Sequence, residues 1–360
     1  MILTGTSCCG CGACCNICAK NAIQMNPNEE GFLYPVIDDQ QCVDCGLCLS
    51  VCPTHSKEEI LNYPLSSFAA WSKNDKIRFE SSSGGVFSVI AEQILDSGGV
   101  VYGAAWGKDL KLTHICVEHV DQLGYLRGSK YLQSDIGSCY SEVKKHLHDG
   151  RRVCFCGTPC QIAGLKLFLR KDYDNLITLV FVCHGVPSQK IFDLFVADIE
   201  SRKNVCLDKY NFRDKTINGW ACNSSSSGLE TESKIRKPFV FDMAMSSYMN
   251  LFMKGMISRE SCYSCDFSQK RRCSDFTLGD FWGVTDVFPE FKNVSNGVSM
   301  LLVNTQKALA FLSDIEEDII LHDCSVDIIA SYNSNLNQPT YRPKDRRSRS
   351  RQGDGSRGLL

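Results

Sequence analysis

The sequence predicts a combined α+β and α/β architecture, with a small cysteine-rich N-terminal domain followed by a larger mixed α/β domain. Ten of the 22 cysteines lie between Cys8 and Cys52. From Phe68 onward, strand-like and helix-like segments alternate, which favours a sheet covered by helices. A chain of 360 residues is long enough for about two or three domains.

The composition excludes several classes of protein. The 39 basic and 41 acidic side chains give a formal net charge of −2, which argues against a nucleic-acid partner. A hydrophobic content of 43% argues against wholesale disorder. No secretory signal and no membrane-spanning apolar run are visible, so we expect a cytoplasmic protein that is at most peripheral to a membrane through a complex. In a reducing compartment, clustered thiols are metal ligands more often than disulfides.

Two cysteine runs in residues 1–62 share one spacing, C-x2-C-x2-C-x3-C, which is typical of bacterial two-cluster ferredoxins. Three thiolates at x2 intervals can wrap one iron–sulfur cubane, whereas the fourth cysteine points towards the other cluster. The spacing therefore predicts two [4Fe–4S] clusters. The first takes Cys8, Cys11, Cys14 and Cys52, and the second takes Cys42, Cys45, Cys48 and Cys18.

Three features leave alternatives open in this domain. Ala19 stands where a proline is expected after the fourth cysteine of the first run. Cys9 and Cys15 are additional thiols, so a shifted register that uses either of them stays open. The paired CxxC segments also suit zinc, although two copies of the full spacing favour iron–sulfur clusters.

The expected elements of the large domain follow in order. Apolar residues recur at helical spacing in 86–95, and the glycines that follow stop this helix. Further helices are expected at 136–147 and 188–199. Strands are expected at 100–106, 153–155 and 177–182, and the last two end at cysteine-bearing loops. We expect a linker at 62–64, a serine-rich loop at 223–228, and a basic tail at 341–360 that is disordered or contacts a partner.

Three segments of the large domain carry chemistry. Ser81–Gly85 precedes a helix, where hydroxyls and backbone N–H groups suit an anion such as a phosphate, although a simple helix cap is the alternative. Cys160 and Cys183 follow two expected strands, at the edge where α/β sheets build their sites. With Cys262 and Cys265 they provide four thiolates, enough for a third cubane, although buried structural cysteines are the alternative. His184 adjoins Cys183 and is a catalytic candidate on that ground alone, with a hydrogen-bonded structural histidine as the favoured alternative.

Five segments in this order resemble a known family: Ser82–Gly85, Gly128–Ser134, Gly157–Gln161, Cys183–Pro187, and Cys262–Cys265 followed by Thr277–Gly283. They resemble the beta subunits of coenzyme F420 hydrogenases and dehydrogenases. With the ferredoxin-type domain in front, the chain looks most like the input subunits of F420H2 dehydrogenases. The 7-hydroxymethyl chlorophyll a reductases belong to the same broad family.

The resemblance implies a flavoprotein whose domain at 66–335 binds FAD beside a third [4Fe–4S] cluster. It places that cluster on Cys160, Cys183, Cys262 and Cys265, with Cys156 and Cys273 as substitutes if one ligand fails. Lys130 is expected to face the pyrophosphate or the negative charge of the reduced flavin. By motif position, the flavin-binding residues are Ser82, Ser83, Gly84, Gly85, Gly128, Ser129, Lys130, Tyr131, Gln133 and Ser134.

The resemblance also implies a function. We expect an oxidoreductase that passes electrons between an organic hydride carrier, coenzyme F420 or a similar compound, and a one-electron partner such as ferredoxin or another redox protein. FAD and three [4Fe–4S] clusters would connect the two. Three alternatives stay open: a ferredoxin-dependent reductase of another organic substrate, a non-catalytic electron-relay subunit of a larger redox complex, and a zinc-stabilised interaction module.

Overall fold

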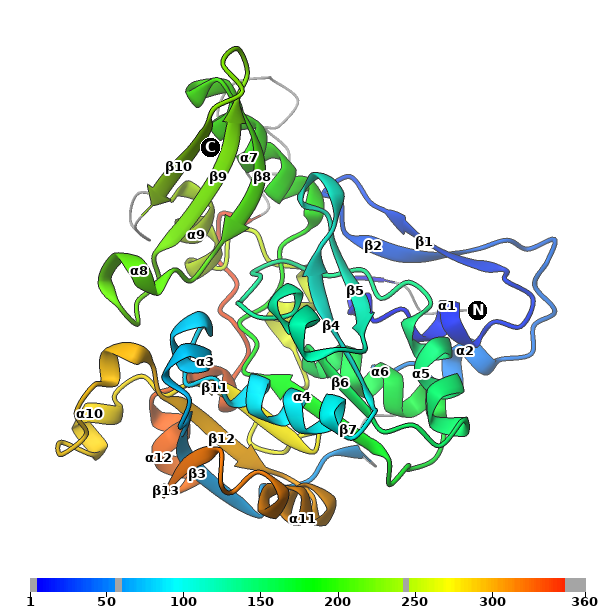
Figure 1. The fold of residues 1–360 in the computed structure, drawn as a ribbon. Helices are drawn as coiled ribbons and strands as arrows, with labels where there is room; N and C mark the ends of the chain where they lie inside the picture. Colours follow the sequence, from blue (N-terminus) through cyan, green and yellow to red (C-terminus); the bar gives the residue numbers. More distant parts are fainter. Residues whose placement is uncertain (1–4, 56–59, 242–245, 347–360) are drawn as a thin grey trace.

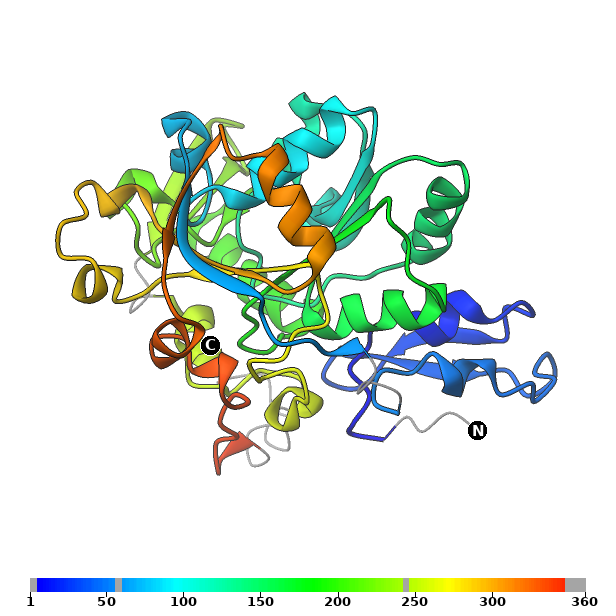
Figure 2. The ribbon, with the colours of Figure 1, turned by 90° about the horizontal axis from the view of Figure 1, so that it is seen from below.

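A computed structural model describes residues 5–55, 60–241 and 246–346 of the chain. Its centre is a mixed eight-stranded sheet, in the order β13-β3-β12-β11-β7-β6-β4-β5. Figures 1 and 2 show helices on both faces of this sheet, with the N-terminal domain beside α5 and α6. The predicted small domain followed by a larger mixed α/β domain is therefore confirmed at the level of architecture.

The four central strands run parallel, which brings their carboxyl ends to one edge of the sheet. Five consecutive residues of β7, from Leu176 to Val180, are buried, as expected for a parallel strand covered on both faces. The strands of the sheet are β3 (Ser66–Ser72), β4 (Val100–Trp106), β5 (Leu112–Val117), β6 (Val153–Gly157), β7 (Leu176–Phe181), β11 (Phe276–Asp280), β12 (Ser299–Val303) and β13 (Ile319–Asp323).

Helix α4 illustrates how the helices cover the eight-stranded sheet. Its apolar side chains pack with those of α11 into one core on one face of the sheet, while α5 and α6 contribute to a second core. Gly85 begins α4 with a φ of 86°, and Gly98 follows its end with a φ of 75°, two left-handed positions that favour glycine. The helices around the sheet are α3 (Asp75–Glu80), α4 (Val86–Asp96), α5 (Cys139–His148), α6 (Pro159–Leu169), α10 (Val284–Val287), α11 (Gln306–Asp314) and α12 (Val326–Ser331).

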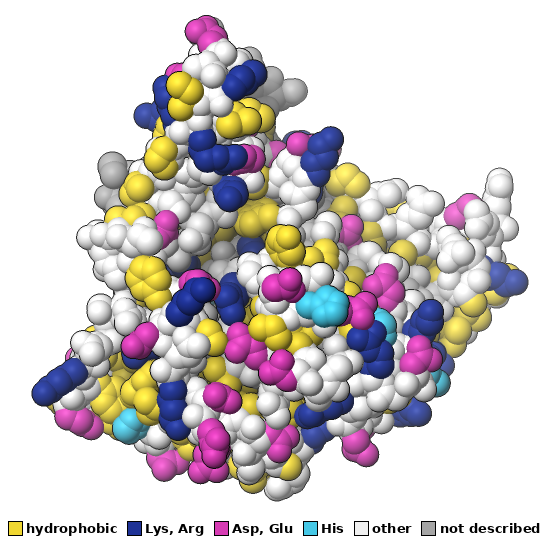
Figure 3. Space-filling view, in the orientation of Figure 1, with side chains coloured by type: hydrophobic (Ala, Val, Ile, Leu, Met, Phe, Trp, Pro, Cys, Tyr) yellow, Lys and Arg dark blue, Asp and Glu magenta, His cyan; other side chains and the backbone are white. Residues whose placement is uncertain are grey.

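A separate lobe is built on a three-stranded sheet in the order β10-β9-β8, and its core is rich in aromatic rings that meet edge to face. In Figure 3, the surface is hollowed where this lobe meets the body, and charges of both signs are interspersed over the face. The lobe comprises α7 (Gln189–Lys203), β8 (Val205–Asn211), α8 (Lys215–Asn218), β9 (Ser224–Glu230), β10 (Arg236–Phe241) and α9 (Ser247–Met253).

The N-terminal domain is small, and it packs against the large domain through α1 and α6. The antiparallel pair of β1 and β2 extends away from these helices (Figure 1). Its elements are α1 (Ala13–Ile17), β1 (Ile23–Pro27), β2 (Leu33–Ile37) and α2 (Leu47–Ser50). Short 3-10 turns complete the chain: η2 (Lys108–Leu110), η3 (Val120–Tyr125), η4 (Glu260–Ser264), η5 (Val294–Asn296) and η6 (Ser334–Leu336).

The predicted helices and strands of the large domain are confirmed, but the loop predicted at 223–228 is wrong. These residues form most of β9, which pairs with both β8 and β10. Ser224 and Ser226 alternate inward along the strand and are buried. Serine has a low strand propensity in isolation, but pairing on both sides overrides it. The predicted linker at 62–64 is also tied down in part, because Asn62 exchanges two backbone hydrogen bonds with Arg272.

The beginning of the predicted tail differs from a disordered arm, because residues 340–346 form a C-terminal clamp. Arg346 donates to Glu30 of the N-terminal domain at 2.5 Å, and Arg342 donates to both carboxylate oxygens of Glu260 at 2.8 and 3.1 Å. Thr340 donates to the carbonyl of His184 at 2.7 Å. Both arginines pair with carboxylates that lie far away in the sequence, so the sequence pattern did not predict these ion pairs. Residues 347–360 of the predicted tail lie outside the described residues.

In the described part of the chain, no helix combines the length and the apolar composition needed to cross a bilayer.

Candidate functional site

The four cysteines assigned to the first N-terminal cluster come together in the fold. Cys8, Cys11, Cys14 and Cys52 line one small cavity of about 20 Å³, together with Cys9. Gly10 and Gly12 adopt φ values of 69° and 75°, so the backbone can curl around this cavity at positions where other residues would be strained. The donor set suits an iron–sulfur cubane, and the ligand assignment itself stays a prediction.

The second N-terminal set lies nearer the surface. Cys45 is exposed and lies close enough to Cys48 to act on it electrostatically. Cys18 stands at the end of α1, which packs against the α2 helix that carries Cys48. The extra thiol of Cys15 donates to the carbonyl of Ile23 at 3.0 Å, so β1 engages it. This set also stays a prediction.

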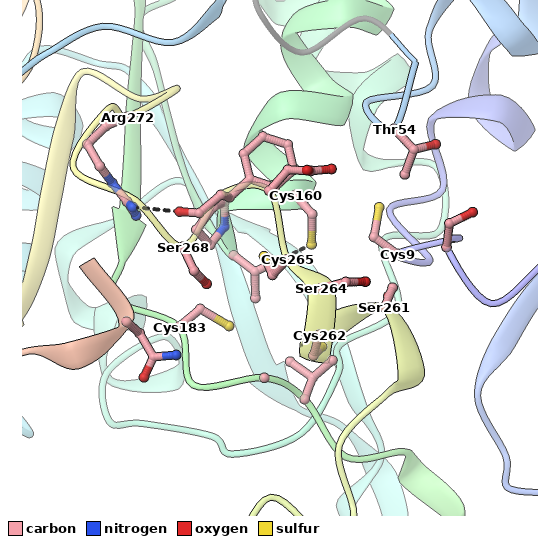
Figure 4. Close-up of a pocket in the computed structure, with 18 of the residues that line it drawn as sticks. Cys9, Thr54, Cys160, Cys183, Ser261, Cys262, Ser264, Cys265, Ser268 and Arg272 are labelled. Atoms are coloured by element: carbon pink, nitrogen blue, oxygen red, sulfur yellow. Dashed lines mark hydrogen bonds between the residues drawn. The ribbon is translucent and has the colours of Figure 1, made fainter. Parts of the chain in front are cut away.

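A larger cavity of about 210 Å³ lies where the parallel strands end. Cys160 follows β6 at the start of α6, Cys183 follows β7, and Cys262 and Cys265 come from η4 and the residue after it. All four cysteines line the cavity, which we call the core cavity (Figure 4). The start of α6 is fixed by a capping box between Thr158 and Gln161 and by Pro159 in its first turn. The fold thus gathers the four thiols proposed for a third cluster.

Cys9 is the fifth thiol of the core cavity, and the sequence did not place it there. It approaches from the N-terminal domain, on the other side of the cavity from Cys183 (Figure 4), and its thiol lies close enough to that of Cys160 for each to affect the pKa of the other. Because Cys9 lines both cavities, the two cysteine sets are neighbours. Neither Cys156 nor Cys273 is among the residues described as lining the core cavity, and Cys273 instead donates to the carbonyl of Pro159 at 3.3 Å.

The core cavity has further features that fit an iron–sulfur cluster. Burial raises the pKa of the Cys262 thiol to about 12 and that of Cys183 well above its usual value, so iron must displace protons to bind there. The buried Ser258 hydroxyl lies beside Gly185, one of the residues that line the core cavity, and has no hydrogen-bond partner among the described residues. No three His, Cys, Asp or Glu side chains in the described ranges are close enough to hold one metal ion, so the thiols of the core cavity surround a larger space.

Two of the loops predicted to bind flavin meet in the fold. The backbone N–H of Ser129 donates to the Ser82 hydroxyl at 2.7 Å, which joins the loop at 128–134 to the loop at 82–85. Tyr131 accepts a hydrogen bond from Arg213 at 3.2 Å, and Arg213 also donates to the carbonyl of Ser82. Arg213 thus holds both loops together.

Positive charge is concentrated behind these loops. Arg213 pairs with Asp280 at 2.7 Å, whereas Lys215 and Arg78 donate to backbone carbonyls, including that of Ser83. Burial, with Arg213 and Arg78 nearby, lowers the pKa of Lys215 to about 7. Three buried cations, with Asp280 paired to Arg213 and Asp75 acting on Arg78, still leave an excess of positive charge that favours an anion such as a pyrophosphate.

Several residues predicted to bind flavin have other partners. Lys130 donates to the carbonyls of Tyr125, Leu126 and Arg127 at the end of η3, and burial lowers its pKa to about 7. Gln133 donates to the carbonyl of Cys9 at 2.8 Å, on the N-terminal domain.

Ser134 and Gly84 of these loops take part in packing within the large domain. Ser134 shares a hydrogen bond with His114 at 2.8 Å. Gly84 packs so tightly on β3 that a Cβ there would lie 2.4 Å from the carbonyl oxygen of Ala70. Its requirement for glycine is thus explained by the fold alone.

His184 shares a neighbouring carboxylate with the loops that Arg213 holds. It follows Cys183 in the chain, and Asp280 lies near enough to oppose the lowering of its pKa by burial. Asp280 also pairs with Arg213 and accepts from Trp220 at 2.7 Å. Its catalytic role stays a prediction.

Comparison with known families agrees with this geometry. Residues 67–139 match the N-terminal part of the beta subunit of coenzyme F420 hydrogenase/dehydrogenase, and residues 150–327 match the C terminus of the same beta subunit. Residues 7–56 match the 4Fe-4S dicluster domain. The chain belongs to the coenzyme F420 hydrogenase/dehydrogenase beta-subunit family. It is an iron–sulfur redox protein of oxidoreductase type.

Other comparisons add little to the family assignment. No curated protein matches the chain. Among solved structures, a chain of the F420-reducing [NiFe] hydrogenase complex from Methanosarcina barkeri is 13% identical, over 78% of this chain and 91% of that chain, with a TM-score of 0.49. A likeness of that size supports no argument about function.

In this member of the beta-subunit family, the residues that sequence reasoning missed are those with no motif spacing. Arg213 and Lys215 are single basic residues in a region of mixed composition, and Arg259 and Arg272 precede or follow the CxxC pair without a pattern of their own. Only Arg271 and Arg272 gave an indication, because they precede Cys273 in the sequence. That pattern places basic residues near a thiol but does not predict that they are buried.

Proposed function

We propose that the chain is an iron–sulfur flavoprotein that passes electrons between an organic hydride carrier, coenzyme F420 or a similar compound, and a one-electron partner such as ferredoxin. The observation that carries the proposal is the core cavity, where four cysteines from three segments face one another beside Cys9 of the N-terminal domain. Four thiols that converge at the carboxyl ends of parallel strands make up the donor set of a cubane.

The spatial order of the residues suits electron transfer. The loops held by Arg213 lie at one end, and Asp280, which pairs with Arg213, acts electrostatically on His184, the chain neighbour of Cys183 in the core cavity. Cys9 then connects the core cavity to the first N-terminal set, beyond which lies the set that includes the exposed Cys45. The exposed end offers a docking point for a redox partner.

FAD would supply the exchange between hydride, which carries two electrons, and the single electrons that iron–sulfur clusters carry. Within the protein, Arg213 fixes the two loops, and the excess of buried cations over carboxylates favours an anionic group against Ser82 and Ser83. Lys130 is less suited to contact that group directly, because three carbonyls already accept its protons.

The test is anaerobic purification of the full chain followed by cofactor analysis. We expect about twelve iron and twelve acid-labile sulfide atoms, from three cubanes, and about one FAD per chain. About eight iron atoms would contradict the core cluster, and iron without FAD would identify a relay subunit.

The hydride carrier is tested on the same preparation. Reduced coenzyme F420 is expected to bleach the flavin absorbance and to reduce a viologen dye in steady state. Bleaching by reduced ferredoxin but not by reduced F420 would instead identify a ferredoxin-dependent reductase of another substrate.

A further inference from the structure

Arg259 is a fully buried cation for which the described residues provide no counter-charge. Its side chain is 0% exposed. Its guanidinium donates to the carbonyl of Cys8 at 2.7 Å, to Gln133 Oε1 at 3.0 Å and to the carbonyl of Leu33 at 2.9 Å. All three acceptors are neutral, and no ion pair joins Arg259 to a carboxylate within residues 5–55, 60–241 and 246–346.

An arrangement of this kind is costly without a partner anion. Removing an arginine from water is unfavourable even when its hydrogen bonds are satisfied, and neutral acceptors return only part of the cost. The Tyr34 ring, with its centroid 4.2 Å from the guanidinium carbon, offsets a further part through a cation–π contact. The remaining imbalance points to a negative group that binds nearby.

The position of Arg259 identifies that group. Through Cys8 it touches the cavity of the first N-terminal set, and it also acts electrostatically on the thiols of Cys160 and Cys262 in the core cavity. Gly10 allows this approach, because a Cβ there would lie 2.8 Å from the guanidinium. Arg259 therefore stands between the two cysteine sets.

We propose that Arg259 is the shared counter-cation of the first N-terminal cluster and the core cluster, and that it raises the reduction potentials of both. The part that concerns the core cluster rests on the proposed function above. A cubane held by four thiolates is anionic and gains a further negative charge when it accepts one electron. A fixed buried cation stabilises the reduced form more than the oxidised form, and net charge is one of the factors that set cluster potentials.

Arg272 provides a matched comparison within the same molecule. It is 2% exposed, lines the core cavity and donates to the carbonyls of Phe267 and Gln269, each at 2.9 Å. No carboxylate among the described residues forms an ion pair with it. The thiols on which it acts include Cys183 and Cys265 but none of the first N-terminal set. Arg272 is expected to raise the potential of the core cluster alone.

The test is a redox titration followed by electron paramagnetic resonance on the anaerobic full-length protein. Cys160→Ala, which should lack the core cluster, assigns the signals. Arg259→Gln is expected to make reduction of two clusters at least tenfold less favourable, which is about 59 mV towards negative potential for one electron. The reduction potential of the cluster assigned to Cys18, Cys42, Cys45 and Cys48 should not change. Arg272→Gln should lower only the core potential, and Arg259→Lys should stay near wild type.

A second variant keeps the proposal falsifiable if Arg259→Gln loses iron. Gln133→Glu places a carboxylate against the guanidinium without removing it, and is expected to lower the same two potentials, whereas Gln133→Leu is not. Unchanged potentials in iron-replete Arg259→Gln or Gln133→Glu protein would overturn the proposal, as would an equal shift of all three clusters. If wild-type protein holds only two clusters, the proposed core cluster fails, but the effect of Arg259 on the first N-terminal cluster is still measured against the distal one.

Discussion

The N-terminal cysteine runs and the core cavity bring cysteines together in two different ways. In the N-terminal runs, Cys8, Cys11 and Cys14 are close because they are close in the chain, and glycines let the backbone turn between them. In the core cavity, Cys160, Cys183 and Cys262 meet only because the ends of β6 and β7 and the turn η4 meet. The arrangement of the N-terminal cysteines follows from their spacing in the sequence, whereas that of the core cavity depends on the fold of the whole sheet.

This difference teaches where each site is vulnerable. The N-terminal cysteine runs lose their arrangement when a ligand or a turn glycine is replaced. An assembled cavity also fails when a distant packing contact is lost, because each ligand is held by a separate element. The two regions are nevertheless not independent, since Cys9 lines both cavities and Cys11 is buried in the core formed by α5 and α6.

Loss of a core ligand should separate the two regions most clearly. Cys160→Ala is expected to remove about four iron atoms per chain, one cubane, while the N-terminal clusters remain. Cys273→Ala is the matched control, because this buried thiol donates to the carbonyl of Pro159 and is not among the lining residues. Iron analysis and cluster absorbance check both. Equal iron contents in Cys160→Ala and wild type would show that the core cavity holds no cluster.

Distant packing is tested by Gly84→Ala in the assembled region. The new Cβ would lie 2.4 Å from the carbonyl oxygen of Ala70 and 2.9 Å from the backbone nitrogen of Ser299, and neither can yield without moving the sheet. We expect a loss of about 1–3 kcal/mol in the free energy of unfolding. Gly124→Ala, which has open space around it, should change little. Denaturant unfolding of the two apoproteins compares them, and equal stability would mean that this glycine is not needed for packing.

Gly164→Ala tests whether the N-terminal cysteine runs depend on the packing of the large domain. Gly164 lies in α6, and its Cβ would come within 2.9 Å of the Cys11 sulfur. Alanine normally favours a helix over glycine by about 1 kcal/mol, so the contact and the helix preference oppose each other. We expect faster loss of N-terminal iron to a chelator with the core iron retained. Chelation rates equal to those of wild type would place Cys11 outside the influence of the large domain.

The smallest expected effect is a pH dependence of FAD binding to the apoprotein. With a pKa lowered to about 7, Lys215 is protonated below pH 7 and loses its charge as the pH rises through that value. An anionic ligand favours the charged form, so the affinity should fall severalfold between about pH 6 and pH 8. Calorimetry should find that Lys215→Met removes most of this dependence. An affinity that rises with pH would contradict it.

The sites formed by nearby residues could be predicted from the sequence better than those assembled from distant segments. The spacing predicts that Cys8, Cys11, Cys14 and Cys52 lie together, and they line one cavity, whereas the set of Cys18, Cys42, Cys45 and Cys48 stays a prediction. Cys160 and Cys183 could be expected at one edge of the sheet because both follow buried strands. Cys9 was left open, because adjacent thiols differ only in the direction of their side chains, which the fold decides. Gln133 belongs to a motif but turns to the N-terminal domain, since its partners Cys9 and Arg259 lie far away in sequence.

Other misses have the same physical origin. The serines of β9 read as a loop because their propensity is local, whereas two neighbouring strands fix their conformation. Arg259 and Arg272 carry no spacing signal, because burial of a lone arginine depends on what surrounds it in three dimensions.

The C-terminal clamp has a consequence for the order in which the molecule can be completed. Arg346 and Glu30, which it joins, are 316 residues apart in sequence. A growing chain folds its N-terminal part first, so the cysteine runs are exposed to iron delivery long before this contact can exist. The same holds for the segment of Cys262 and Cys265, which is made late and is then tied through Glu260 to Arg342. Biogenesis can therefore load the N-terminal domain during translation, whereas the core cavity is finished only near the end of synthesis.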